Sequence, residues 1–81
     1  MNELRSDESL DLRGVICPLN FVETKLKLEE MEEGQILEVT IDDGDPIRNV
    51  PRSVKAEGHR ILGVKRLEDN TYKLFICKIG V

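Results

Sequence analysis

The sequence predicts a two-layer α/β sandwich, in which two helices cover one face of a mixed four-stranded sheet. At 81 residues the chain has room for one domain with one modest core. Its apolar patterns follow the order strand, helix, strand, helix, strand, strand (βαβαββ), and right-handed crossovers bring both helices to the same side of the sheet. We expect residues 1–8 to form a flexible tail and residues 9–81 to form the single domain.

The four strands are predicted from alternating apolar residues and from the turn residues between them. They are "SLDLRG" (9–14), "QILEVTI" (35–41), "RILGVKRL" (60–67) and "TYKLFICKI" (71–79). The last two are separated by the turn signal "EDN" and are therefore expected to form a hairpin.

The first helix is predicted from its start and stop signals. Pro18 suits the first turn of a helix, because its missing N–H would have no intrahelical partner there. The helix is expected to run to about Met31 and to stop at Gly34.

The second helix is predicted to begin with Asp45 as the N-cap and Pro46 at the first helical position, and to close at Gly58. Pro51 conflicts with a regular helix, because proline removes one backbone hydrogen bond. We therefore expect an irregular first turn or a late start.

Charge and composition exclude several classes of function. The formal net charge is −4 and no cluster of lysine and arginine is present, so direct nucleic acid binding is not expected. No apolar run is long enough to span a bilayer, and the polar start of the chain is unlike a signal peptide. We therefore expect a cytoplasmic protein with no membrane partner. With no Trp, two Phe and one Tyr, an aromatic cofactor pocket is not expected either.

Cys17 is the residue best placed for chemistry. It directly precedes Pro18, so it is predicted at or beside the N-cap of the first helix, where unpaired N–H groups and the helix dipole favour an anion. Its thiol pKa should therefore lie below the usual value of about 8.5. Gly14 permits the preceding turn and Arg13 adds a nearby cation. The alternative is that Cys17 is a small apolar residue that fills a corner.

Other candidate residues favour structural roles. Cys77 could act as a resolving thiol or second carrier, but nothing in its predicted strand should activate it. His59 and the two cysteines lack zinc-ligand spacing, so no metal site is expected. The acidic residues at 42–45 are interpreted as turn and cap residues.

Two segments resemble the TusA/SirA family of small sulfur carriers: "LDLRGVICPLN" and "GQILEVTIDDGDPIRNVPRSVKAEGH". The signature of that family is a strand, an Arg-Gly turn and Cys-Pro-x-Pro at the start of a helix, matched here by Cys17-Pro18-Leu19-Asn20. The resemblance implies that Cys17 accepts sulfane sulfur as a persulfide and passes it to another protein. Its supporting residues would be Arg13, Gly14, Pro18 and Asn20.

The resemblance also implies the partners. A cysteine desulfurase or a rhodanese-like protein would donate the sulfur, and a downstream protein would accept it. The acceptor pathway stays open among tRNA thiolation, molybdenum cofactor assembly and sulfur oxidation. Asn20 replaces the second proline of the signature, which bears on the choice of partner.

The chain is thus predicted to be a sulfur-relay protein that depends on partner enzymes and needs no cofactor. A thiol redox sensor and a non-catalytic interaction module are the alternatives. The first helix also carries a second apolar stripe, opposite its core face, at Leu19, Val22 and Leu26. We expect Leu19 to stay exposed as part of the partner surface, whereas the second helix could cover Val22 and Leu26.

Overall fold

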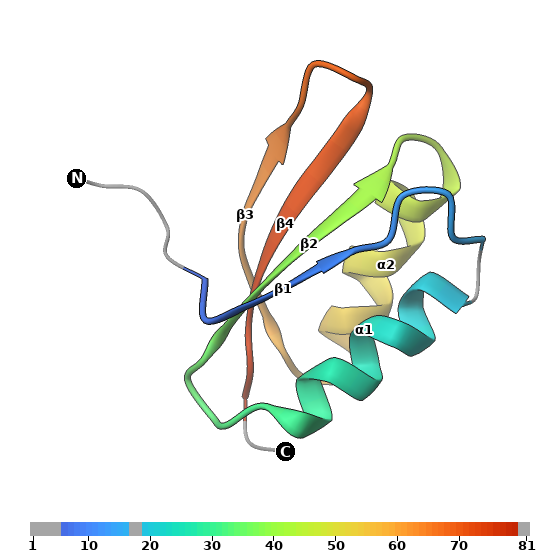
Figure 1. The fold of residues 1–81 in the computed structure, drawn as a ribbon. Helices are drawn as coiled ribbons and strands as arrows, with labels where there is room; N and C mark the ends of the chain where they lie inside the picture. Colours follow the sequence, from blue (N-terminus) through green and yellow to red (C-terminus); the bar gives the residue numbers. More distant parts are fainter. Residues whose placement is uncertain (1–5, 17–18, 80–81) are drawn as a thin grey trace.

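The computed structural model describes residues 6–16 and 19–79. Figure 1 shows the strands and helices of this part of the chain. In chain order they are β1 Glu8–Asp11, α1 Leu19–Glu30, β2 Ile36–Asp42, α2 Asp45–Ala56, β3 Arg60–Arg66 and β4 Thr71–Cys77. Within these residues, no helix has the length and apolar character needed to cross a membrane.

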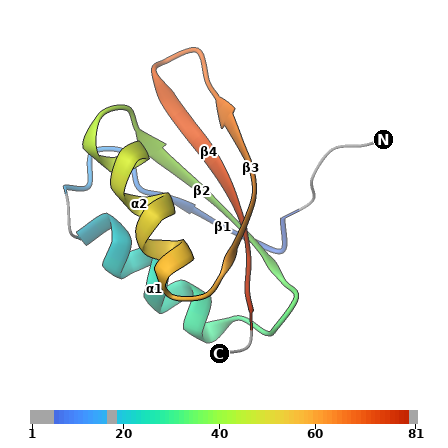
Figure 2. The same ribbon diagram turned by 180° about the vertical axis from the view of Figure 1, so that it is seen from behind.

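The four strands form one mixed sheet in the order β1-β2-β4-β3. β1 pairs parallel to β2, whereas β4 pairs antiparallel to both β2 and β3. Both helices lie against the same face of this sheet in Figure 1 and in the reverse view of Figure 2, and the other face is left open. The predicted two-layer α/β fold is confirmed.

The core lies between the sheet and the two helices. Alternate residues of β2 and β4 point into it, as the period of two in these strands predicts. Its buried apolar residues are Leu12, Leu28, Met31, Leu37, Val39, Ile41, Val50, Val54, Leu74 and Ile76. One layer of aliphatic side chains therefore holds both helices on the sheet.

The boundary between tail and domain is earlier than the sequence suggests. Glu8 already belongs to β1. Before it, the Asp7 N–H donates to the Ile36 carbonyl at 2.7 Å, and the Ile36 N–H donates to the Asp7 carboxylate at 2.8 Å. Residues 6–8 are thus part of the sheet edge, because main-chain pairing with β2 extends beyond the apolar alternation on which the prediction was based. Residues 1–5 lie outside the described part of the chain.

The start of α2 differs from the prediction by one residue. Gly44, with φ of 93°, is the N-cap, and no side chain of the described residues caps the helix there. Asp45 is instead the first helical residue and Pro46 follows it. Glycine reaches this positive φ without strain, so the turn ends one residue earlier than an aspartate cap would require. Asp45 still places a carboxylate at the positive end of the helix dipole.

Pro51 lies inside α2, which begins at Asp45, so the prediction of a late start was wrong. A proline inside a helix costs about 3 kcal/mol, because it removes a hydrogen bond and crowds the preceding turn. Val50 and Val54 on either side are fully buried against the sheet. Their packing keeps the helix continuous, as tertiary contacts commonly override local preference.

Residues that follow β4 hold the ends of both helices. The Lys78 ammonium donates to the Leu28 carbonyl at 2.6 Å, near the C-terminal end of α1. The Ile79 N–H donates to Nδ1 of His59, just beyond α2, at 3.0 Å. His59 Nδ1 must therefore be unprotonated for this second contact to form.

The His59 contact predicts a pH-dependent stability. Burial, and then the charge of Lys78, lower the pKa of His59 below its ordinary value of 6.5, with Glu57 opposing. The unfolded chain then binds the proton more tightly, so stability should fall as pH drops below about 6.5 and level off below the folded pKa. Thermal unfolding between pH 7.5 and 5 measures this effect.

His59→Asn is the matched control, because an asparagine oxygen replaces the Nδ1 acceptor and does not titrate. The variant should lose less stability than the parent over that pH range. Identical pH profiles for the two proteins would assign the loss to other groups.

Candidate functional site

Cys17 and Pro18, the centre of the predicted site, lie outside the described residues, whereas both flanks are described. Before them, Ile16 is 71% exposed, and after them Leu19 is 52% exposed at the first position of α1. The Asn20 N–H donates to the Ile16 carbonyl at 3.2 Å. This hydrogen bond ties the start of α1 to the loop residue Ile16, at a point where large apolar side chains face solvent.

The loop before Cys17 is held by hydrogen bonds from its backbone N–H groups. Gly14 adopts a φ of 81°, and its N–H donates to the Asp42 carboxylate at 2.6 Å. The Val15 N–H donates to the Leu12 carbonyl at 3.1 Å. Gly14 is therefore a turn residue, as predicted. Its contact with Asp42 was not predicted, although the parallel pairing of β1 and β2 brings these two loops to one sheet edge.

Arg13 is engaged with carboxylates. Its Nε and Nη2 donate to the two oxygens of Asp11 at 2.9 and 2.7 Å, and Nη1 lies 3.4 Å from Asp69. These hydrogen bonds lower the pKa of Asp11 to about 2 and raise that of Arg13. The guanidinium thus links β1 to the turn between β3 and β4. Its predicted role as a cation for Cys17 stays a prediction.

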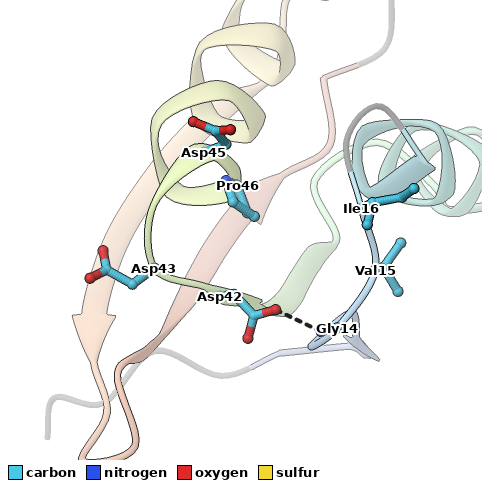
Figure 3. Close-up of a pocket in the computed structure, with 7 residues that line it drawn as sticks. All are labelled: Gly14, Val15, Ile16, Asp42, Asp43, Asp45 and Pro46. Carbon is cyan, nitrogen blue, oxygen red and sulfur yellow. Dashed lines mark hydrogen bonds between the residues drawn. The ribbon is translucent and has the colours of Figure 1, made fainter.

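A pocket of about 380 Å³ lies between this loop and the start of α2 (Figure 3). One wall is the segment 14–16, which leads directly to Cys17, and the opposite wall contains Asp42, Asp43, Asp45 and Pro46. Figure 3 shows Asp42 turned toward Gly14, to which it is hydrogen bonded. The acidic residues interpreted as turn residues thus also give this side of the predicted site a negative charge.

Asn20 is the unexpected member of the site. Its side chain is fully buried on the core face of α1, together with Thr24 and Leu28. Its Oδ1 accepts from the Phe21 N–H at 2.7 Å, but its Nδ2 has no hydrogen-bond acceptor among the described residues. A buried donor without a partner costs about 1–3 kcal/mol. The sequence indicated this position only through its helical spacing to Thr24 and Leu28.

The outer side of α1 carries the second apolar stripe that the sequence predicts. Together with the loop residue before Cys17 it forms an exposed apolar surface, called here the α1 stripe, which consists of Ile16 (71% exposed), Leu19 (52%), Val22 (42%) and Leu26 (53%). Helix α2 therefore does not bury Val22 or Leu26. Exposed carboxylates of Glu23 and Glu29 lie beside this surface on the same helix. Ile16 was not anticipated as part of it.

The remaining candidates lie away from this edge or have structural partners. Cys77 ends β4, half-buried, beside Ile36 and Arg60 on the neighbouring strands. His59 accepts the hydrogen bond from Ile79. Among residues 6–16 and 19–79, no group of three His, Cys, Asp or Glu side chains is arranged to hold a metal ion.

A mixed sheet with both helices on one face (Figure 1) defines a small two-layer α/β domain, and in the sequence the Cys17-Pro18 pair directly precedes α1. Comparison with known proteins gives the family. The family model described as "Sulfurtransferase TusA" matches residues 8–78. The chain belongs to the TusA family.

Curated relatives agree with this assignment, and a solved structure agrees with the fold. A protein of Archaeoglobus fulgidus is 47% identical over 76 residues, which cover 94% of this chain and 86% of that protein. A protein of Thermotoga maritima is 37% identical, with 94% and 96% covered. Both are described as "Putative sulfur carrier protein". The crystal structure of a SirA-like protein from Desulfitobacterium hafniense superposes with a TM-score of 0.78 at 19% identity, covering 90% of this chain and 99% of that one, and shows the same fold.

Proposed function

We propose that this chain carries sulfane sulfur as a persulfide on Cys17, between a sulfur donor enzyme and an acceptor protein. The observation that carries the proposal is the position of Cys17 in a TusA-family chain: α1 begins two residues later, and exposed apolar residues lie on both sides. The donor would be a cysteine desulfurase or a rhodanese-like protein. The relay would operate in the cytoplasm, where thiols stay reduced.

The transfer step conserves atoms and electrons. The Cys17 thiolate attacks the outer sulfur of a donor persulfide, a new sulfur–sulfur bond forms, and the donor leaves as a thiolate. The donor's sulfur–sulfur bond breaks as the new one forms, so the pair as a whole undergoes no net oxidation or reduction. An acceptor thiolate then attacks the outer sulfur on Cys17 in the same way, and Cys17 leaves as a thiolate. The chain supplies a reactive sulfur, and the partner enzymes supply the rest of the chemistry.

The start of α1 favours this chemistry. A helix N-terminus carries roughly half a positive charge and presents unpaired N–H groups, which stabilise a thiolate or a persulfide anion. Carboxylates at 42–45 act in the opposite direction, because negative charge disfavours a second anion. The short-range contribution of the helix should dominate, because Asp43 and Asp45 are exposed, where water and salt screen them, and the Asp42 carboxylate already accepts from the Gly14 N–H.

The expected result of that balance is a Cys17 thiol pKa below about 8.5. In a Cys77→Ser variant, Cys17 is the single thiol. The alkylation rate of this variant is measured as a function of pH, and the midpoint of the curve gives the thiol pKa. The same protein in denaturant provides the reference. If the folded and unfolded proteins had the same midpoint, the helix would not be lowering the pKa of the Cys17 thiol.

Incubation with a cysteine desulfurase and cysteine tests the proposed function directly. Intact mass should show one additional sulfur that reductant removes. A redox sensor would instead gain oxygen with peroxide and no sulfur from the desulfurase, and an inert interaction module would gain neither.

The α1 stripe is the proposed contact surface for both partners. Its apolar residues start at the flanks of Cys17, and the exposed carboxylates of Glu23 and Glu29 lie beside them. A matching partner would present an apolar patch with basic residues at its edge, because opposite charges steer association. Leu19 is the central residue of this proposal.

A further inference from the structure

Helix α2 and strand β3 carry positive charge that the rest of the fold does not neutralise. Residues 46–67 contain six lysines and arginines and one glutamate, whereas residues 6–45 contain three lysines and arginines and twelve carboxylates. The exposed cations on the helix side of the sheet are called here the α2–β3 basic surface: Arg48, Arg52, Lys55 and Arg66. We propose that this surface binds an acidic segment of a partner protein. The inference concerns binding alone and does not depend on the chemistry of Cys17.

Three of these cations form one row on α2. Arg48, Arg52 and Lys55 follow one another at spacings of four and three residues, which places them on the same side of the helix. All three are exposed. The fully buried Val50 and Val54 lie on the opposite side of α2. The row therefore points away from the core and toward solvent.

Arg66 extends this row onto the neighbouring strand. Helix α2 packs against β3, which is an outer strand of the sheet. Val64 of β3 pairs with Leu74 of β4, whose side chain is in the core, and paired residues share a face of the sheet. Arg66, two residues later, lies on that same face. Because Val64 is exposed, the surface combines cations with an apolar side chain, as protein interfaces do.

The cations of this surface have no carboxylate partners among the described residues. Within residues 46–67, no lysine or arginine forms an ion pair with any carboxylate of residues 6–16 and 19–79. Arg66 reaches only a neutral group, the Asn70 amide oxygen, at 3.4 Å. Outside 46–67, each described lysine and arginine either pairs with a carboxylate or donates to a backbone carbonyl. They are Arg13, Lys25, Lys27, Lys73 and Lys78.

The distribution of charge favours a protein segment over a nucleic acid or a membrane. The net charge of the chain is −4, so a polyanion that extends beyond the α2–β3 basic surface would meet repulsion from the carboxylates elsewhere. Surfaces that bind single-stranded nucleic acid also present aromatic rings for stacking. The three aromatic residues of this chain belong to α1 and β4. A short acidic segment can cover the basic surface alone.

The α2–β3 basic surface and the α1 stripe should select different proteins. Carboxylates of Glu23 and Glu29 lie beside the α1 stripe and attract basic residues. The α2–β3 basic surface attracts carboxylates and repels a partner with a basic edge. Charge complementarity therefore makes this face a second docking surface, distinct from the one used for sulfur transfer.

The test measures the binding of a short dye-labelled peptide, rich in glutamate with interspersed valine, to the full chain by fluorescence anisotropy. The parent protein should bind at low salt, and its affinity should fall as salt is added, because ions screen exposed charges. Arg48→Gln combined with Arg52→Gln should weaken binding about fivefold, since exposed ion pairs contribute little individually. Arg66→Gln, on a different element, should weaken it about twofold. Thermal unfolding should be unchanged in both, because the substituted side chains are exposed.

Lys27→Gln combined with Lys73→Gln is the matched control. It removes the same net charge as the α2 double variant, but from cations that already have carboxylate partners, so binding should stay at the parent level. An equal loss in this control, or no binding by the parent protein, would overturn the proposal. A single-stranded DNA oligonucleotide of equal charge and vesicles that contain phosphatidylserine are the competing ligands. Tighter binding of either one than of the peptide would also overturn it, and would assign the surface to nucleic acid or to a membrane.

Discussion

Cys17→Ser is expected to abolish sulfur loading completely and to leave the fold unchanged. A serine hydroxyl cannot form the persulfide, and the segment that contains residue 17 joins two exposed flanks, Ile16 and Leu19. Intact mass after incubation with a cysteine desulfurase and cysteine should show no added sulfur. The unfolding temperature should match that of the parent, because serine differs from cysteine by a single atom and both described flanks of residue 17 are exposed.

Cys77→Ser is the control for this experiment and should load as fully as the parent. The two variants together separate the cysteines by function, since each retains one thiol. Loading of Cys17→Ser at the parent level would transfer the carrier role to Cys77 at the end of β4.

Leu19→Asp is expected to lower the rate of sulfur transfer from the donor by at least about tenfold, with little change in stability. The reason is the loss of an apolar contact at the centre of the proposed interface, where the few residues that cost more than about 1 kcal/mol when truncated tend to cluster. Asp in the first turn of α1 is compatible with the helix dipole, so the helix should persist. Transfer is measured as kcat/KM with limiting carrier, and stability by thermal unfolding.

Two further variants make the result specific to the surface. Leu19→Gln removes the apolar contact without adding charge near Cys17, and it should also slow transfer. Val64→Asp on β3 alters a side chain of similar exposure, 53%, on the far edge of the sheet, and transfer should remain at the parent rate. Equal losses for Leu19→Asp and Val64→Asp would point to overall charge instead of a docking surface.

The fold could be predicted because its strongest signals are periodic and local. The alternation of Leu37, Val39 and Ile41 requires a strand with one buried face, and these three residues are fully buried. Gly58, with a φ of 98°, directly follows the C-cap of α2, as its position indicates, whereas α1 already ends at Glu30 and Gly34 lies in the turn before β2. The order of elements and the handedness of the crossovers then leave few alternative arrangements.

What the sequence could not reveal depends on contacts between distant residues. Arg13 pairs with Asp69, 56 positions later, and no local pattern indicates that contact. The burial of Asn20 opposes the usual exposure of asparagine, and only its helical phase with Leu28 indicates it. The observed N-cap of α2 is Gly44, whereas Asp45 was predicted. Glycine and aspartate both suit this position, so the sequence could not distinguish the two adjacent residues.

The order of the strands has a consequence for how the chain folds. β4 is the last strand to be made, yet it is the neighbour that β2 and β3 share. A growing polypeptide can form α1 and α2 early, but the sheet against which they pack stays incomplete until residue 77 is available. The loops that follow β1 and β2 depend on that late step. Arg13 in the first loop contacts Asp69 in the β3–β4 turn, and β2 has β4 as its second neighbour. Folding is therefore expected to be a single concerted event, slower than that of a helical bundle of similar length, and the thiol should acquire its tuned reactivity only at the end of it.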